Sequence, residues 1–199
     1  MTRRRGRFGI GKVARCCGVS NYTIRPIRAS EWREVRALRL AGLEDDAAPL
    51  AFVESYDEGA AMPDSFWIDR AAGSSVDAGP AAGARQFVAV ADDDGWVGTS
   101  VVIVESAGEK DFEGRTVESS GGHVVGVFIE PRHRGSGLVE RLFEASLDWA
   151  QERGLSRVRL YVHAENRRAK DAYRKCGFEP TGVRLDGALG QEIEMARCI

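Results

Sequence analysis

The stretch Val127-Phe128-Ile129-Glu130-Pro131-Arg132-His133-Arg134-Gly135-Ser136-Gly137-Leu138 decides the fold of this chain. In it an apolar strand ends at a proline, and a basic, glycine-rich turn then opens a strongly amphipathic helix over 137–153. The first amides of a helix have no partner within the helix, and glycines let the backbone approach a ligand closely. With the helix dipole and the arginines, this turn is typical of an anion cradle. A plain strand-to-helix turn with solvated arginines is the alternative.

A second segment, 158–178, favours the cradle. Alternation predicts a strand over 158–162, and a short helix is expected over 166–176, ended by Gly177 in a left-handed cap position. Asn166 can cap this helix and also bond a ligand amide. Tyr173 lies on the helix face that packs on the sheet, from where its hydroxyl can reach a cleft. A tyrosine buried in the core is the alternative.

Alternation and helical periodicity predict the other elements. A strand over 22–27 contains Pro26, which favours a sheet edge, and Ser30 is expected to cap the helix that follows. No element is predicted over 44–62. The remaining predictions are a helix over 63–72, a hairpin of strands 86–91 and 96–105, a long polar connection over 106–122, a strand over 123–129, and a final hairpin of strands 181–185 and 192–195. This order of elements is mixed α/β, built on one sheet.

Length and composition indicate one globular domain. The chain has 199 residues, 43% hydrophobic and 29% charged, which excludes disordered and fibrous classes. The longest charge-free apolar run, about Val97 to Val104, is far shorter than the ~20 residues that span a bilayer. The N-terminal arginines are not followed by the apolar run of a signal peptide, so a cytoplasmic protein is expected. No metal is expected, because the four cysteines show no metal-ligand spacing; they are Cys16, Cys17, Cys176 and Cys198.

Charge divides the chain into two parts. Residues 1–30 contain eight Lys and Arg and no Asp or Glu, so the rest of the chain carries a net charge of −10. We expect residues 1–20 to form a flexible basic extension and residues 21–199 to form the folded domain. An acidic body repels nucleic acid and steers cationic ligands.

The two segments together resemble the GNAT (GCN5-related N-acetyltransferase) superfamily. The resemblance rests on the V-x-x-x-P-x-x-R-G-x-G run from Val127 and on the N-x-x-x-x-x-x-Y-x-x-x-G-F run from Asn166, and it covers about residues 22–197. It implies a central twisted mixed sheet of about seven strands flanked by about four helices. It also implies an enzyme that transfers acetyl from acetyl-CoA directly to an amine.

The resemblance implies a role for each matching residue. Val127, Phe128 and Ile129 would hydrogen-bond the pantetheine arm as an added strand does, with a backbone amide there stabilising the oxyanion, and Asn166 would also contact that arm. Tyr173 would protonate the leaving thiolate as general acid. Of two registers, Arg132-x-x-Gly135-x-Gly137 and Arg134-x-x-Gly137-x-Val139, the second has the usual distance from Pro131 and is preferred. The pyrophosphate would then be held by Arg134 and by the amides of Gly135, Ser136, Gly137, Leu138, Val139 and Glu140.

The general base and the acceptor stay open. Some relatives place a glutamate where this chain has Tyr161, and the candidates for the base are Glu105, His123, Glu130 or a relayed water. Residues 44–69 contain eight acids and no Lys or Arg, so that wall of the cleft would attract a protonated amine such as a polyamine, an aminoglycoside-like sugar or a basic peptide end; a solvated acidic loop is the alternative.

Two other functions compete with catalysis. Residues 10–25, IGKVARCCGVSNYTIR, resemble the helix-turn-helix of MerR-type regulators, but Pro26 interrupts the second helix, so DNA binding is disfavoured. A non-catalytic acyl-CoA-binding regulator is the other alternative, and the tyrosine at 173 favours the enzyme. A second copy of the chain is a candidate partner.

Overall fold

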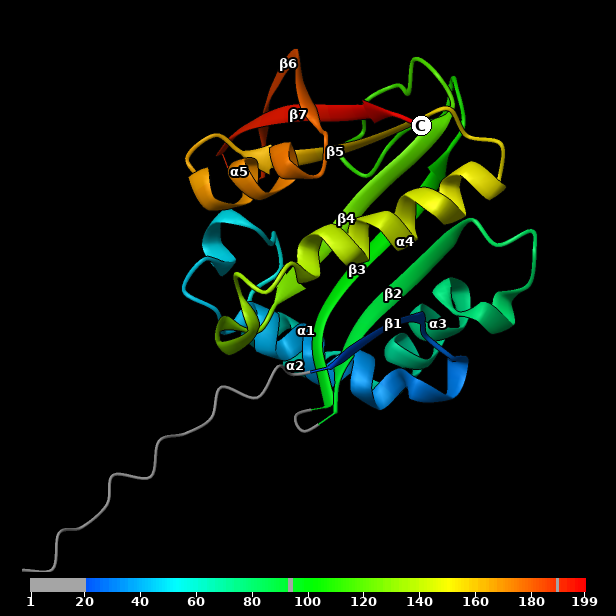
Figure 1. Ribbon diagram of the computed structural model, residues 1–199, viewed down its shortest axis with the longest axis vertical. Helices are drawn as coiled ribbons and strands as arrows, with labels where there is room; N and C mark the ends of the chain where they lie inside the picture. Colours follow the sequence, from blue (N-terminus) through cyan, green and yellow to red (C-terminus); the bar gives the residue numbers. More distant parts are fainter. Residues whose placement is uncertain (1–20, 93–94, 189) are drawn as a thin grey trace, which may run out of the picture.

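The computed structural model describes residues 21–92, 95–188 and 190–199. Within these ranges the chain forms seven strands and five α-helices on a single sheet (Figure 1). The strands are β1 (Tyr22–Pro26), β2 (Ala84–Ala91), β3 (Gly95–Glu105), β4 (Gly121–Ile129), β5 (Arg157–His163), β6 (Glu179–Gly187) and β7 (Gly190–Cys198). The α-helices are α1 (Trp32–Leu43), α2 (Tyr56–Ala61), α3 (Asp64–Ser74), α4 (Leu138–Glu152) and α5 (Arg167–Lys175).

The sheet has the order β1-β2-β3-β4-β5-β7-β6 and is antiparallel except between β4 and β5. That one parallel contact consists of only two residue pairs, Gly122 with Val158 and His123 with Arg159. A register shift in β3 lies opposite Gly126, whose φ of 61° is a left-handed conformation that favours glycine. Beyond His123 the two strands are therefore unpaired, and the edge of β4 that faces β5 is open.

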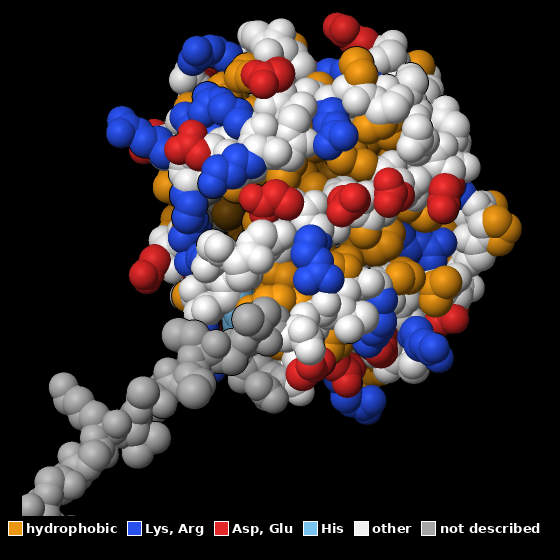
Figure 2. Space-filling model, in the orientation of Figure 1, with side chains coloured by type: hydrophobic (Ala, Val, Ile, Leu, Met, Phe, Trp, Pro, Cys, Tyr) orange, Lys and Arg blue, Asp and Glu red, His pale blue; other side chains and the backbone are white. Residues whose placement is uncertain are grey.

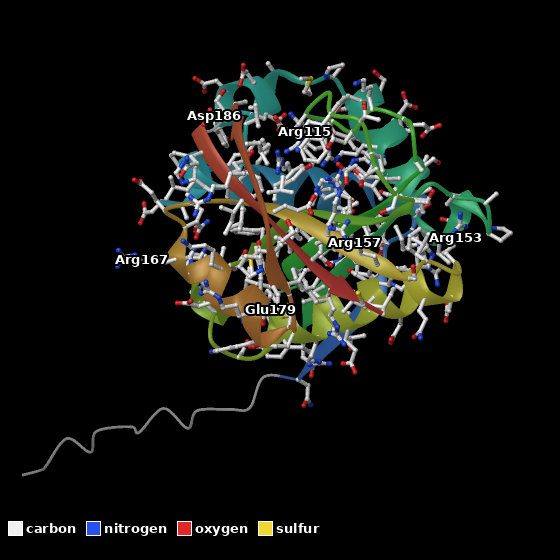
Figure 3. The ribbon with its side chains drawn as sticks, turned by 90° about the horizontal axis from the view of Figure 1, so that it is seen from above. Arg115, Arg153, Arg157, Arg167, Glu179 and Asp186 are labelled. Carbon is white, nitrogen blue, oxygen red and sulfur yellow. The ribbon has the colours of Figure 1, made fainter. Side chains whose placement is uncertain are left out.

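Helices cover both faces of the sheet. In Figure 1, α4 crosses in front of β2, β3 and β4 while α1 and α3 lie behind them, and Figure 3 shows the same layers from the side. Alternate residues of β2 enter two separate cores: Ala89 packs with Leu142 and Phe143 of α4, and Val88 packs with Trp67 of α3. Side-chain alternation on β2 thus divides the molecule into an α4–α5 side and an α1–α3 side.

Most predicted elements are confirmed, including the edge position of β1. The predicted cap at Ser30 is wrong: a 3₁₀ turn (Ala29–Glu31) comes first, and Glu31 accepts a bond from the Arg28 amide at 2.7 Å. The helix α2 was not predicted because it has only six residues, too few for a period. Its signal was the capping box in which Ser55 and Glu58 bond each other's backbone amides.

Two sequence interpretations concern the N-terminal region. The basic extension, residues 1–20, lies outside the described residues, as does most of the helix-turn-helix-like segment. The described end of that segment is the strand β1, which pairs with β2 from Tyr22 to Pro26. A recognition helix ending at residue 25 is therefore not present in the folded domain.

Candidate active site

A cavity of about 410 Å³ lies where β4 and β5 diverge. Its walls come from the end of β4, the glycine turn, the start of α4, the helix α5 and the segment 45–52. Eleven of the twelve residues expected to bind acetyl-CoA line it: Val127, Phe128, Ile129, Arg134, Gly135, Gly137, Leu138, Val139, Glu140, Asn166 and Tyr173. The structure thus brings the two sequence segments together around one cleft.

The glycine turn presents free backbone donors to this cavity. Gly135 and Gly137 have φ values of 78° and 80°, and a Cβ at either would meet no atom within 4 Å. The first helical hydrogen bond of α4 runs from the Arg141 amide to the Gly137 carbonyl, and no amide of residues 135–140 donates to another described residue. Helix α4 also has no side-chain cap. The turn is therefore an anion cradle with its donors unused.

Arginines add positive charge around the cradle. The Arg134 Nε donates to the Ile129 carbonyl at 3.0 Å, and Arg134 lines the cavity whereas Arg132 does not, which favours the second register. Basic side chains also gather over α5 in Figure 2, and two of them, Arg168 and Lys175, line the cavity. This side of the cleft is suited to a polyanion.

Asp45 is an unexpected member of this site. Its buried carboxylate accepts a hydrogen bond from the Arg134 guanidinium and lies 3.8 Å from Arg168. Burial acts to raise the pKa of Asp45, but the Ala47 amide and Arg134 lower it overall. The run of acids over 44–69 placed Asp45 on the acceptor wall, and nothing in the sequence indicated that it faces the basic turn.

Asn166 and Tyr173 are placed by α5. The Asn166 Oδ1 accepts a bond from the Ala169 amide at 3.1 Å, which confirms the predicted cap. The Tyr173 ring stacks on Phe143, with centroids 5.2 Å apart, and its hydroxyl bonds no described residue. Burial raises the pKa of Tyr173 above its ordinary value, so the phenol keeps its proton at neutral pH. The structure holds a protonated phenol in the cavity wall.

Two predicted residues point elsewhere. Ser136 does not line the cavity, and its hydroxyl donates to the His133 carbonyl at 2.6 Å, inside the turn. Glu130, a candidate base, also lies outside the cavity lining and pairs with the exposed Arg132 at 3.3 Å. Neither side chain is positioned to act on a ligand in this cleft.

Glu105 and His123 form a buried pair on the α1–α3 side of the sheet. The Glu105 Oε1 lies 2.8 Å from the His123 Nδ1, and Arg159 donates to both oxygens of Glu105, at 2.7 and 2.9 Å. Burial acts to raise the pKa of Glu105, but the bonds from His123 and Arg159 lower it to about 2. Glu105 is therefore ionised, and the proton between the two residues stays on His123 Nδ1.

The other nitrogen of His123 is unused. Its Nε2 is buried and bonds no described residue, and the ring lies against Phe112 and Tyr161, with centroids 4.9 and 5.0 Å away. His123 belongs to the last residue pair that joins β4 to β5, so it lies where the strands separate, although, like Glu130, it is not part of the lining of the large cavity. The sequence predicted Glu105 and His123 as separate candidates. It did not predict Arg159, although an arginine among the alternating apolar residues of β5 is unusual enough to indicate a buried partner.

Arginines neutralise part of the acidic segment 44–69. Asp45 pairs with Arg134, Glu54 with Arg39 at 3.0 Å, and Asp64 with Arg36 at 3.5 Å. The other five acids are exposed (Glu44, Asp46, Asp57, Glu58 and Asp69). The segment is therefore not a continuous wall of unpaired carboxylates.

Fold and cavity define a mixed α/β protein with a cleft, lined by unused backbone amides, at a split between parallel strands. A model of the acetyltransferase (GNAT) family matches residues 54–178, well over half of the chain. The chain belongs to the GNAT acetyltransferase family. This confirms the resemblance and the expected fold.

Known proteins similar to this chain are acetyltransferases. Mycothiol acetyltransferase of Saccharomonospora viridis is 37% identical over 94 residues, covering 47% of this chain and 29% of that protein. Streptothricin acetyltransferase of Streptomyces lavendulae is 34% identical over 113 residues, covering 57% and 53%. The solved phosphinothricin acetyltransferase of Sinorhizobium meliloti superposes with a TM-score of 0.64 at 15% identity, over 89% of this chain and 88% of that one. The matched part of this chain spans about half or less of the two curated relatives.

No described helix combines the length and the apolar character needed to cross a membrane. Among the same residues, no three His, Cys, Asp or Glu side chains are grouped so that they could hold a metal ion.

Proposed function

We propose that this chain is an N-acetyltransferase that moves the acetyl group of acetyl-CoA directly to a primary amine of a small molecule (polyamine, amino acid or aminoglycoside-like) or of a peptide. Membership of the GNAT family supports the class of reaction. The observation that carries the proposal is one cavity that holds both unused backbone amides and the protonated phenol of Tyr173. The arrangement offers an anion site and a proton donor to one ligand.

The cavity fits acetyl-CoA. The amides of residues 135–140 and the Arg134 guanidinium would hold the diphosphate, and the open edge of β4 at 127–129 would bond the amides of the pantetheine arm. A complex with acetyl-CoA is known for the Sinorhizobium meliloti protein of the same fold. Asn166 lines the same cavity and would contact this arm, although its Oδ1 already caps α5.

Two residues would carry the protons. In one displacement the new C–N bond forms and the C–S bond breaks, so a proton must leave the amine and another must reach the sulfur. His123 Nε2 would take the first, because Nδ1 is held by the ionised Glu105. Tyr173 would give the second to the thiolate. Amides of β4 that face the split would bond the developing oxyanion.

Calorimetry with acetyl-CoA and a CoA-release assay test the proposal. We expect saturable binding of acetyl-CoA and release of CoA that depends on an added amine. Binding of acetyl-CoA without transfer to any amine would instead support the non-catalytic acyl-CoA-binding regulator. Absence of binding would contradict both functions.

A pair of variants tests the base. We expect His123→Gln to lower kcat by roughly 100-fold while acetyl-CoA affinity is unchanged, because Nε2 would no longer take the amine proton. Glu130→Gln is the matched control, since Glu130 is a surface ion-pair partner outside the cavity. Equal activity of His123→Gln and the native chain would assign the base to a water.

A further inference from the structure

The Asp45 carboxylate is a negative charge inside the large cavity. Its side chain is only 6% exposed, and Asp45 lines the cavity together with Gly135 and Gly137 of the glycine turn. It accepts a hydrogen bond from the Arg134 Nη2 and lies 3.8 Å from Arg168, and both arginines line the same cavity. A bound polyanion and Asp45 would therefore seek the same positive groups and would repel each other.

Both oxygens of Asp45 are held in place by the folded chain. The Oδ1 accepts a hydrogen bond from the Ala47 amide at 3.0 Å, which is the local bond typical of an aspartate in a turn. The Oδ2 accepts the bond from Arg134. Burial acts against ionisation of the carboxyl group, but the Ala47 amide and Arg134 lower its pKa overall. The cavity thus contains an ionised carboxylate before any ligand enters.

Arg134 does not depend on Asp45 for its orientation. The Arg134 Nε donates to the Ile129 carbonyl at 3.0 Å, and the guanidinium group is planar, so this bond fixes its direction at the end of β4. Without the charge of Asp45, Arg134 would stay in the cavity wall and its Nη2 would be available to a ligand. The effect of Asp45 on anion binding is therefore competition rather than support.

We propose that Asp45 is an internal counter-anion that competes with the diphosphate of acetyl-CoA for Arg134 and so limits the affinity of the cleft. This inference rests on the proposed function. A ligand displaces Asp45 only if it brings more negative charge than one carboxylate, as a diphosphate does. The product CoA keeps the diphosphate, so the same competition weakens product binding and favours its release.

An isosteric variant tests the competition. Asp45→Asn keeps an oxygen for the Ala47 amide and removes the charge. We expect the affinity for acetyl-CoA, for CoA and for inorganic pyrophosphate to rise roughly tenfold in calorimetry, because Arg134 is no longer neutralised. Asp46→Asn is the matched control, since Asp46 is exposed, lies outside the cavity lining and should not affect binding. Unchanged or lower acetyl-CoA affinity in Asp45→Asn would overturn the inference.

Two further variants separate charge from shape. Asp45→Glu keeps the charge, and its affinity for acetyl-CoA should stay within about threefold of the native value. Asp45→Ser removes the charge and keeps a hydroxyl that can accept from the Ala47 amide, so it should behave as Asp45→Asn does. It also carries the test if Asp45→Asn does not fold, as judged by circular dichroism. An equal gain in the Glu and Asn variants would indicate a loosened cavity wall and overturn the role of the charge.

Product inhibition tests the consequence for turnover. The inhibition constant of CoA should fall roughly tenfold in Asp45→Asn, in step with its affinity. A native inhibition constant in a variant that binds acetyl-CoA more tightly would overturn the part of the inference that concerns product release.

The same calorimetry separates the two levels of proposal. If the native chain binds acetyl-CoA and Asp45→Asn binds it no more tightly, only the inference on Asp45 fails. If neither chain binds acetyl-CoA, the proposed function itself fails.

Discussion

The acid role proposed for Tyr173 depends on the surroundings of its side chain. Its ring is held against Phe143, and its hydroxyl is left without a partner among the described residues in a cavity that also contains the glycine turn. Burial disfavours the phenolate, so the residue can give a proton but does not lose it to solvent. The sequence indicated the helix face on which Tyr173 lies, but only the folded chain shows the stacking.

Tyr173→Phe should lower kcat by roughly 100-fold and leave acetyl-CoA affinity nearly unchanged, because the ring stays and only the proton donor is lost. Stopped assays of CoA release and calorimetry measure the two quantities. Tyr56→Phe, at an exposed tyrosine of α2, is the control and should behave as the native chain does. Native turnover in Tyr173→Phe would remove the acid role.

The ionisation of Glu105 makes the free energy of unfolding depend on pH. Its pKa in the folded chain is about 2, below the ordinary value of 4.5, so its ionised form stabilises the fold above about pH 4.5. That contribution, at most roughly 3 kcal/mol, is lost as pH falls through 4.5 toward 2.

Glu105→Gln should therefore unfold more easily than the native chain at pH 7, and the difference should shrink below about pH 4. Urea unfolding across this pH range measures it. Asp111 and Glu194, which also bind Arg159, titrate in both proteins. Glu118→Gln, at an exposed position in the connection between β3 and β4, is the control. A difference independent of pH would contradict the low pKa.

At the scale of the element, the glycine turn depends on backbone conformation rather than on side chains. Gly137 directly precedes α4 with a φ of 80°, which an alanine adopts at a cost of about 1–2 kcal/mol. The amides that follow Gly137 belong to residues that line the cavity. The pattern R-G-S-G in the sequence predicted a glycine-rich turn, but the second segment, 158–178, was needed to favour an anion cradle over a plain strand-to-helix turn.

Gly137→Ala should lower both the free energy of unfolding, by about 1–2 kcal/mol, and the affinity for acetyl-CoA. Gly73→Ala is a matched control, since Gly73 lies inside α3, has no positive φ, and has no atom within 4 Å of an added Cβ. There the same substitution should stabilise the chain by about 0.5–1 kcal/mol and leave binding unchanged. Thermal unfolding and calorimetry measure both variants. Unchanged affinity in Gly137→Ala would contradict the cradle.

At the scale of the whole molecule, the sheet separates two kinds of chemistry. The α4–α5 side carries the glycine turn and Tyr173, and the α1–α3 side carries the buried pair of Glu105 and His123. Figure 3 shows Arg115 and Asp186 on the α1–α3 side and Arg167 and Glu179 on the other. The split between β4 and β5 lies between the two sides, so we expect donor and acceptor to meet there.

Removal of residues 1–18 should leave folding and acetyl-CoA affinity unchanged. The edge strand β1 begins at Tyr22, and the seven-stranded sheet consists of residues from 22 onward. Circular dichroism, thermal unfolding and calorimetry measure the truncated chain against the full one. Salt-sensitive DNA binding that is present in the full chain and lost on truncation would instead support the helix-turn-helix alternative.

The sequence by itself determined most of the order of elements, the family, the glycine turn and the placement of Asn166 and Tyr173 on one helix. Each of these depends on spacing along one or two neighbouring elements. Tertiary structure decided which side chains face each other across the sheet. The contacts of Asp45 with Arg134 and of Arg159 with Glu105 join elements distant in the chain, and no local period indicates such contacts. Helix α2 was missed for a local reason, because its six residues are too few to show a helical period.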